Sequence, residues 1–296
     1  AGRVFGIQTL TRAFSDPATR TTELPKGESL AEQTGLREWP STYEGRSVLF
    51  VIVESFGSHK SPEIRAWLAA QLADKQIHDI YDIRETTIRF KGATTDGELR
   101  FLCGLIGRYN ALSGSLKENC LPARFASAGW ATHGFHGFSG QMFDRRAWWP
   151  DIGIQKMHFA EDLLGSDAPR CGAAFRGACD TRLVRSLVPI LSEPRQFVYL
   201  LTLNTHIPIE KTSVPEDLGL LCVRAQTGPT PCQHVAALGA FFRELRQTLL
   251  VISTPPAVVV VGDHAPPLSN RKDRDLFSDQ HVPVHVLTPR LSANSQ

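Results

Sequence analysis

The sequence has no apolar run long enough to cross a bilayer and no large excess of charge of either sign. Its longest apolar runs, residues 47–53 and 257–261, have the length of a strand, whereas a transmembrane helix needs about 20 apolar residues. The formal net charge is +2 over 296 residues, without the basic stripes that mark nucleic-acid binding. The composition therefore argues against a membrane span within these residues and against a nucleic-acid partner.

The sequence also lacks the Cys-x-x-Cys spacing of a zinc cluster. It has six cysteines, which are Cys103, Cys120, Cys171, Cys179, Cys222 and Cys232. The last four form two closely spaced pairs around loop-like stretches, which favours local disulfides formed in an oxidising compartment. Pairing in chain order is the preferred arrangement, and six reduced core thiols are the alternative.

Short β-branched runs alternate with helical patterns over most of the chain. Strands are expected at 47–53, 130–134, 196–203, 257–261 and 281–286, and the longest helix at about 231–252. This alternation predicts an α/β fold, with a mostly parallel central sheet and helices on both faces. Residues 1–45 show little apolar periodicity, and we expect them to be an extended arm or linker before a catalytic domain at 46–296.

Four of the expected strands end in polar side chains. They are Glu54, the pair His133 and His136, the pair Asn204 and His206, and the pair Asp263 and His264. Because the carboxyl ends of parallel strands converge at one edge of a sheet, Glu54, Asp263 and His264 could meet around one cation. Two carboxylates and one imidazole suit Zn²⁺ or Mn²⁺. On its own, each of these residues could equally be an ordinary loop residue.

Thr94 lies in a loop that leads into a helix, where it could complete the metal site as an alkoxide. The cation and the helix N-terminus would both stabilise this anion, and the alkoxide could attack phosphorus to give a phospho-threonine. The following backbone N–H groups would hold the phosphoryl oxygens. Thr95 is a rival nucleophile, and either threonine could simply cap the helix. Asp96 and Glu98 are expected to complement the helix dipole in the first turn.

Six short motifs, in this order, resemble the alkaline phosphatase/sulfatase superfamily, and most closely its lipoteichoic acid synthase and phosphoethanolamine transferase branches. The motifs are Glu54-Ser55-Phe56, the segment Gly92 to Glu98, His136-Gly137 with Phe143-Asp144-Arg145, Asn204 to Pro208, Gly262-Asp263-His264 and His281-Val282-Pro283. The resemblance covers about residues 46–290.

The resemblance implies an alkaline phosphatase-like sandwich with one divalent metal ion. By this resemblance Thr94 is the nucleophile. The implied metal ligands are Glu54, Thr94, Asp263 and His264, and the implied substrate-binding residues are His136, Arg145, His206 and His281.

The superfamily contains other enzyme types whose motifs are missing here. Cys103-Gly-Leu-Ile-Gly lacks the proline and arginine of a formylglycine sulfatase, and no Asp-x-x-x-His pair of a two-zinc enzyme follows Asp263. A single metal with a threonine nucleophile favours transfer over hydrolysis.

The resemblance implies a transferase that moves phosphoethanolamine or phosphoglycerol from a phospholipid donor to an envelope glycan or lipid acceptor. Such an enzyme would work at a membrane surface in the periplasm, as an extracytoplasmic domain anchored to the inner membrane through a region upstream of the arm. The Phe143-Asp144-Arg145 motif favours phosphoglycerol, and the paired cysteines favour phosphoethanolamine. The alternatives are a phosphatase, phosphodiesterase or sulfatase-type hydrolase, and a binding module that has lost its metal.

Overall fold

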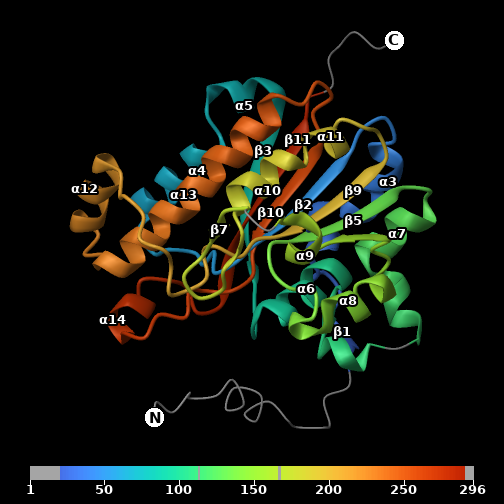
Figure 1. Ribbon diagram of the computed structural model, residues 1–296, viewed down its shortest axis with the longest axis horizontal. Coiled ribbons are helices and arrows are strands. Elements are labelled where there is room, and N and C mark those ends of the chain that lie inside the picture. Colours follow the sequence, from blue (N-terminus) through green and yellow to red (C-terminus); the bar gives the residue numbers. More distant parts are fainter. Residues whose placement is uncertain (1–20, 113, 166–167, 291–296) are drawn as a thin grey trace.

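A seven-stranded sheet runs through the centre of the protein (Figure 1). The computed structural model describes residues 21–112, 114–165 and 168–290. The strand order is β3-β11-β10-β2-β9-β5-β6. In chain order these strands are β2 (Val48–Val53), β3 (Tyr81–Arg89), β5 (Ala131–His136), β6 (Lys156–His158), β9 (Gln196–Leu201), β10 (Ala257–Gly262) and β11 (His281–Pro289).

The central part of the sheet is parallel. Each neighbouring pair from β10 to β6 is parallel, whereas β11 and β3 extend the sheet in antiparallel pairings. Consequently the carboxyl ends of β10, β2, β9 and β5 lie side by side at one edge. The prediction of a mostly parallel α/β sheet is confirmed.

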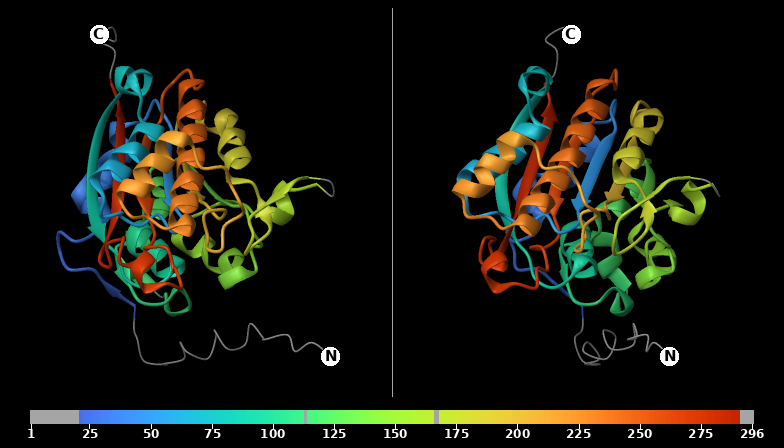
Figure 2. Two further views of the ribbon diagram at one scale, coloured as in Figure 1. Left: turned by 90° about the vertical axis from the view of Figure 1, so that its left-hand side faces the viewer. Right: turned by 60° about the vertical axis from the view of Figure 1, so that its left-hand side comes forward.

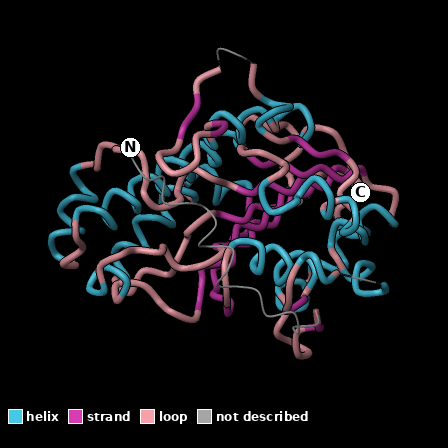
Figure 3. Tube along the Cα trace, turned by 60° about the horizontal axis from the view of Figure 1, so that its bottom comes forward, coloured by secondary structure: helices cyan, strands magenta, loops and turns pink. Residues whose placement is uncertain are grey.

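Strand β2 shows why both faces of the sheet need a covering layer. All six of its residues are buried, as expected for a central strand of a parallel sheet. Leu49, Val51 and Val53 pack into one hydrophobic core, and the residues between them pack into a second core on the other face. The strands form a central band with helices on both sides (Figure 3).

The two helical layers differ in length and regularity. The longest helix, α13, runs beside the strands (Figures 1 and 2). Its layer contains α4 (Pro62–Leu72), α5 (Lys75–Ile80), α10 (Asp180–Ser186), α11 (Val188–Leu191), α12 (Glu216–Arg224) and α13 (Pro229–Leu250). The opposite layer contains α2 (Leu30–Thr34), α3 (Trp39–Thr42), α6 (Thr94–Cys103), α7 (Leu121–Ser127) and α8 (Arg145–Trp148). Two further helices are α9 (Ala160–Leu163) and α14 (Arg271–Arg274).

Several short elements lie between the longer helices and strands in the chain. The two-residue strands pair as β1 (Thr22–Glu23) with β4 (Leu105–Ile106), and β7 (Arg170–Cys171) with β8 (Gly177–Ala178). The 3-10 helices are η1 (Leu36–Glu38), η2 (Tyr109–Ala111), η3 (Gly114–Asn119), η4 (Met142–Asp144) and η5 (Pro150–Ile152). Among the described residues, none of the helices combines the length and apolar character needed to cross a membrane.

The described part of the expected arm is helical and packed against the domain. Ser29 caps α2 by accepting a hydrogen bond from the backbone N–H of Glu32. Leu30, Leu36 and Trp39 are buried in the core that α6 and α7 share. The segments are only three to five residues long, too short to show helical periodicity in the sequence. Residues 1–20 lie outside the described part, and the division at residue 45 stays a prediction.

Three disulfides join the cysteines in chain order, as preferred from the sequence. They are Cys103–Cys120, Cys171–Cys179 and Cys222–Cys232. The first joins α6 to the start of α7, and the third joins α12 to α13. Each bond closes a short loop, which limits the freedom of the unfolded chain.

Candidate active site

Two carboxylates and one imidazole meet where β2 and β10 end. Glu54 directly follows β2, and Asp263 and His264 directly follow β10. The two strands are parallel neighbours, with Val53 paired to Gly262. Each of the three side chains offers a ligand atom within 4.8 Å of the others. His264 Nε2 lies 3.6 Å from Glu54 Oε1 and 3.3 Å from Asp263 Oδ2.

The chemistry of these donors fits a divalent cation. Asp263 Oδ1 accepts hydrogen bonds from the backbone N–H groups of Ser55 and His264, both at 2.7 Å. Asp263 Oδ2 is buried and has no hydrogen-bond partner among the described residues. His264 Nδ1 lies 2.8 Å from the carbonyl oxygen of Ala265, which makes Nδ1 the protonated nitrogen and leaves the Nε2 lone pair available. Zn²⁺ and Mn²⁺ both accept such a set of oxygen and nitrogen ligands.

The electrostatics of the metal-free cluster are unfavourable. Burial and the nearby Glu54 carboxylate raise the pKa of Asp263 from 3.8 to about 8. Burial lowers the pKa of His264, but Asp263 and Glu54 outweigh it, and the net shift is upward. Two nearly buried carboxylates so close together are hard to ionise without a positive charge. A cation would provide that charge.

Thr94 is the first residue of α6 and faces this cluster. Its hydroxyl donates to Glu54 Oε2 at 3.0 Å and lies 3.4 Å from His264 Nε2. The N-cap residue is Ala93, so Thr94 does not fill the capping role that was its alternative. Within the described residues no corresponding contact brings Thr95 to these three side chains, so Thr94 is the threonine that faces them, and its role as the nucleophile stays a prediction.

The first turn of α6 is fixed close to Asp263. Asp96 Oδ2 accepts from the backbone N–H of Ala93 at 2.8 Å, in keeping with its expected first-turn role. Gly97 packs against Asp263, because a Cβ added at residue 97 would lie 3.3 Å from the Asp263 Cβ. The glycine thereby lets the first turn of α6 approach Asp263 closely.

Glu98 is the clearest departure from the sequence expectation. It is fully buried and does not act as a first-turn surface carboxylate. Its Oε2 accepts two bonds from Arg145, at 3.0 and 2.9 Å, and its Oε1 accepts from Trp149 and Tyr199, each at 3.0 Å. Arg145 is therefore engaged with Glu98, whereas the exposed Arg146 pairs at the surface. The assignment of Arg145 to the substrate stays a prediction.

The remaining expected substrate residues lie at the same edge of the sheet. His136 ends β5, and its Nδ1 lies 3.1 Å from the carbonyl oxygen of Leu201. Burial lowers the pKa of His136 to about 3, so its ring is neutral. His206 follows β9 and packs edge-on against Phe175 at 4.8 Å, and its Nδ1 is buried without a partner among the described residues. His281 begins β11, which runs antiparallel to β10.

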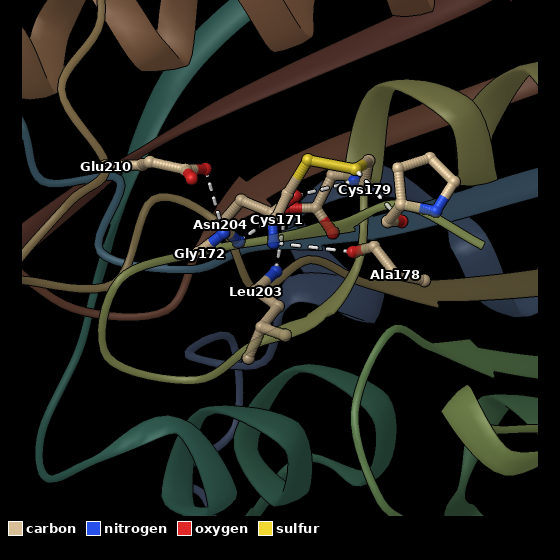
Figure 4. Close-up of a disulfide and its surroundings, with 9 residues drawn as sticks. Cys171, Gly172, Ala178, Cys179, Leu203, Asn204 and Glu210 are labelled. Carbon is tan, nitrogen blue, oxygen red and sulfur yellow. Dashed lines mark hydrogen bonds between the residues drawn. A yellow bond between two sulfur atoms is a disulfide. The ribbon is translucent and has the colours of Figure 1, made fainter. Parts of the chain in front are cut away.

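A disulfide loop is fixed beside the segment that carries His206. Asp180 Oδ2 accepts from the backbone N–H groups of Leu203 and Asn204, at 2.9 and 2.6 Å, and Asn204 Oδ1 accepts from the Asp180 N–H at 2.7 Å. Figure 4 shows Asn204 next to the Cys171–Cys179 bond. Burial raises the pKa of Asp180 to about 7. The sequence analysis did not predict that Asp180 would bind the backbone after β9. The available signal was its position directly after Cys179 and at the start of a helix.

Comparison with known proteins shows the fold of the chain. No protein-family model and no curated protein matches the sequence. Solved structures do match, including the phosphoglycerol transferase GacH of Streptococcus pyogenes, with a TM-score of 0.59, 16% identity, and coverage of 91% of this chain and 78% of that one. The lipoteichoic acid synthase LtaP of Listeria monocytogenes matches with a TM-score of 0.57, 16% identity, and coverage of 83% and 66%.

A third solved structure also matches the fold of the chain. A protein in the alkaline phosphatase superfamily from Vibrio parahaemolyticus has a TM-score of 0.57, 12% identity, and coverage of 83% of this chain and 60% of that one. The present chain thus spans about two thirds or less of the length of LtaP and of the Vibrio protein. The chain shares its α/β fold with these structures, one of which is a member of the alkaline phosphatase superfamily, and the predicted fold class is confirmed.

Proposed function

We propose that this chain contains the catalytic domain of a metal-dependent transferase. It moves phosphoethanolamine or phosphoglycerol from a phospholipid, through a phospho-threonine, to a glycan or lipid acceptor of the cell envelope. The observation that carries the proposal is the position of Thr94 Oγ1, 3.0 Å from Glu54 Oε2 and 3.4 Å from His264 Nε2, at the start of a helix. A single threonine beside one three-ligand group suits formation of a covalent intermediate.

The chain supplies the nucleophile and its surroundings. Thr94 Oγ1 forms a bond to the phosphorus of the donor, the bond from phosphorus to the diacylglycerol oxygen breaks, and that oxygen takes up a proton. An acceptor hydroxyl then attacks the same phosphorus, which frees the Thr94 oxygen to regain its proton. Glu54, Asp263 and His264 would hold a divalent cation, which lowers the free energy of the ionised threonine oxygen and of the developing phosphoryl charge.

Other groups at this edge of the sheet can bind the phosphate. The first N–H groups of a helix have no acceptor within the helix, and at the start of α6 they can bind phosphoryl oxygens. The unpartnered Nδ1 of His206 is a further polar group near the carboxyl ends of the strands. Because these groups bind phosphate and not the head group, they fit both donors. Disulfide bonds suit an oxidising compartment, and we place the reaction at an extracytoplasmic membrane surface.

Diacylglycerol release tests this function. Protein loaded with Zn²⁺ or Mn²⁺ is mixed with detergent micelles of phosphatidylethanolamine or of phosphatidylglycerol, and diacylglycerol is quantified by mass spectrometry. We expect release from one of the two lipids by the wild type and by Thr95→Ala, and none by Thr94→Ala. Unchanged diacylglycerol release by Thr94→Ala would contradict the assignment of Thr94 as the nucleophile. Rapid hydrolysis of a chromogenic phosphate ester without lipid turnover would instead establish a hydrolase.

A further inference from the structure

Ser55 directly follows Glu54 in the turn after β2, and its backbone has a conformation that serine rarely adopts. Its φ is 57°, in the left-handed region that favours glycine and, less strongly, asparagine and aspartate. The residue is fully buried. Among the described non-glycine residues only five have positive φ, and Ser55 is the one that adjoins Glu54. A strained backbone at such a position points to a constraint from the site itself.

This conformation lets one residue bind both carboxylates. The Ser55 hydroxyl donates to Glu54 Oε1 at 2.8 Å. The Ser55 backbone N–H donates to Asp263 Oδ1 at 2.7 Å. Glu54 and Asp263 follow different strands and are 209 residues apart in the sequence, and Ser55 forms hydrogen bonds to both.

The surrounding backbone holds the turn in place. A Cβ added at Gly262 would overlap the carbonyl oxygen of Phe56, and a Cβ added at Gly57 would lie 2.8 Å from the Cα of Ala265. The turn after β2 therefore packs directly on the turn after β10. Because the two turns are in tight contact, the backbone of Ser55 is held in the position where its two hydrogen bonds form.

Ser55 binds one oxygen of each carboxylate. On Asp263, Oδ1 is occupied by two N–H donors, and Oδ2 remains buried without a partner among the described residues. On Glu54, Oε1 accepts from Ser55 and lies 3.6 Å from His264 Nε2, and Oε2 accepts from the Thr94 hydroxyl. The bonds from Ser55 therefore fix the orientation of both carboxylates beside His264 and Thr94.

We propose that Ser55 is a positioning residue, whose hydroxyl and left-handed backbone orient Glu54 and Asp263 for cation binding. This inference rests on the metal site of the proposed function. Groups that hold metal ligands in place commonly change metal affinity by about 10- to 100-fold when they are removed.

Metal titration of three variants tests the inference. Binding of Zn²⁺ and Mn²⁺ to the full chain is measured by calorimetry for the wild type, Ser55→Ala and Ser55→Gly, with the partly buried Ser58→Ala as the matched control. Both Ser55 variants lose the hydroxyl, but glycine adopts positive φ readily, and we expect Ser55→Gly to have the higher Tm of the two in the metal-free form. We expect affinity to fall about 10- to 100-fold in both, and Ser58→Ala to bind as the wild type does.

The outcomes separate positioning from folding. If both Ser55 variants bind metal within threefold of the wild-type affinity, the inference is overturned. It is also overturned if Ser55→Gly binds metal normally and only a destabilised Ser55→Ala binds it weakly. A wild type that binds neither cation overturns the metal site and the inference with it. Weaker metal binding in both variants, in a protein that transfers no head group, supports the role of Ser55 while the proposed function fails.

Discussion

Replacing Asp263 with asparagine should stabilise the metal-free protein while it abolishes metal binding. The Asp263 carboxylate is buried beside Glu54, and its Oδ2 has no partner among the described residues. Asparagine keeps an oxygen that can accept from the N–H groups of Ser55 and His264. Its amide nitrogen would replace Oδ2, 3.3 Å from His264 Nε2, where it can donate a hydrogen bond. The variant therefore removes a buried charge without losing the existing contacts.

The size of the effect depends on pH. The pKa of Asp263 is about 8 in the folded protein, compared with an ordinary value of 3.8. Between these values the folded state holds a proton that the unfolded state has lost, so the wild type loses stability as pH rises from about 4 to about 8. The full shift corresponds to roughly 6 kcal/mol at about 1.4 kcal/mol per pH unit. Because side chains and water relax around a buried charge, we expect a gain of about 2–4 kcal/mol for Asp263→Asn at pH 8.

Urea unfolding of chelator-treated protein at pH 5 and pH 8 measures this difference. The stability gap between Asp263→Asn and the wild type should widen at pH 8, while the exposed Asp275→Asn stays within about 0.5 kcal/mol of the wild type at both values. Adding Zn²⁺ should stabilise the wild type and leave Asp263→Asn unchanged. If metal-free Asp263→Asn is less stable than the wild type at pH 8, or if the stability gap does not depend on pH, the Asp263 charge does not destabilise the metal-free protein.

Two further predictions concern the packing around the site. Arg145→Met should lower the free energy of unfolding by about 3–5 kcal/mol, because it leaves the Glu98 carboxylate buried without its cation; Arg146→Met, at the surface, should change it by less than about 1 kcal/mol. If urea unfolding shows the same loss of stability for Arg145→Met and Arg146→Met, the Arg145–Glu98 pair does not have the expected importance. Gly262→Ala should lower both Tm and Zn²⁺ affinity, because a Cβ there overlaps the backbone of the turn after β2. Gly165→Ala, where a Cβ meets nothing within 4 Å, should leave both unchanged, and a Gly262→Ala that matches it would show that the two turns are not in tight contact.

The meeting of the three candidate metal ligands could be predicted from the sequence because these residues directly follow central strands. The β-branched run that ends in Gly262 identifies β10, and the run at 47–53 identifies β2. Parallel strands place the residues that follow them at one edge. Glu54, Asp263 and His264 therefore come together without any long-range information beyond the sheet itself. The position of Thr94 could also be predicted, because a glycine-containing loop followed by apolar residues at helical spacing locates the helix N-terminus.

The partners of buried polar residues could not be predicted in this way. Glu98 lies four residues after Thr94, on the same side of α6, but nothing local indicates that Arg145, Trp149 and Tyr199 would surround it. Edge strand β3 was missed for a related reason. Several of its side chains are exposed, so its sequence lacks the apolar run that identified the central strands. Its place in the sheet depends on pairing with β11, about 200 residues away in the chain.

The most direct measurement of the central claim is mass spectrometry of the trapped intermediate. Metal-loaded protein is exposed to phosphatidylethanolamine or phosphatidylglycerol and quenched in acid, and its intact mass and peptides are analysed beside Thr94→Ala. We predict a phosphoethanolamine or phosphoglycerol adduct on Thr94 that is absent from Thr94→Ala. An adduct on Thr95 that persists in Thr94→Ala, or no adduct with either lipid in protein shown to hold its metal, would contradict it.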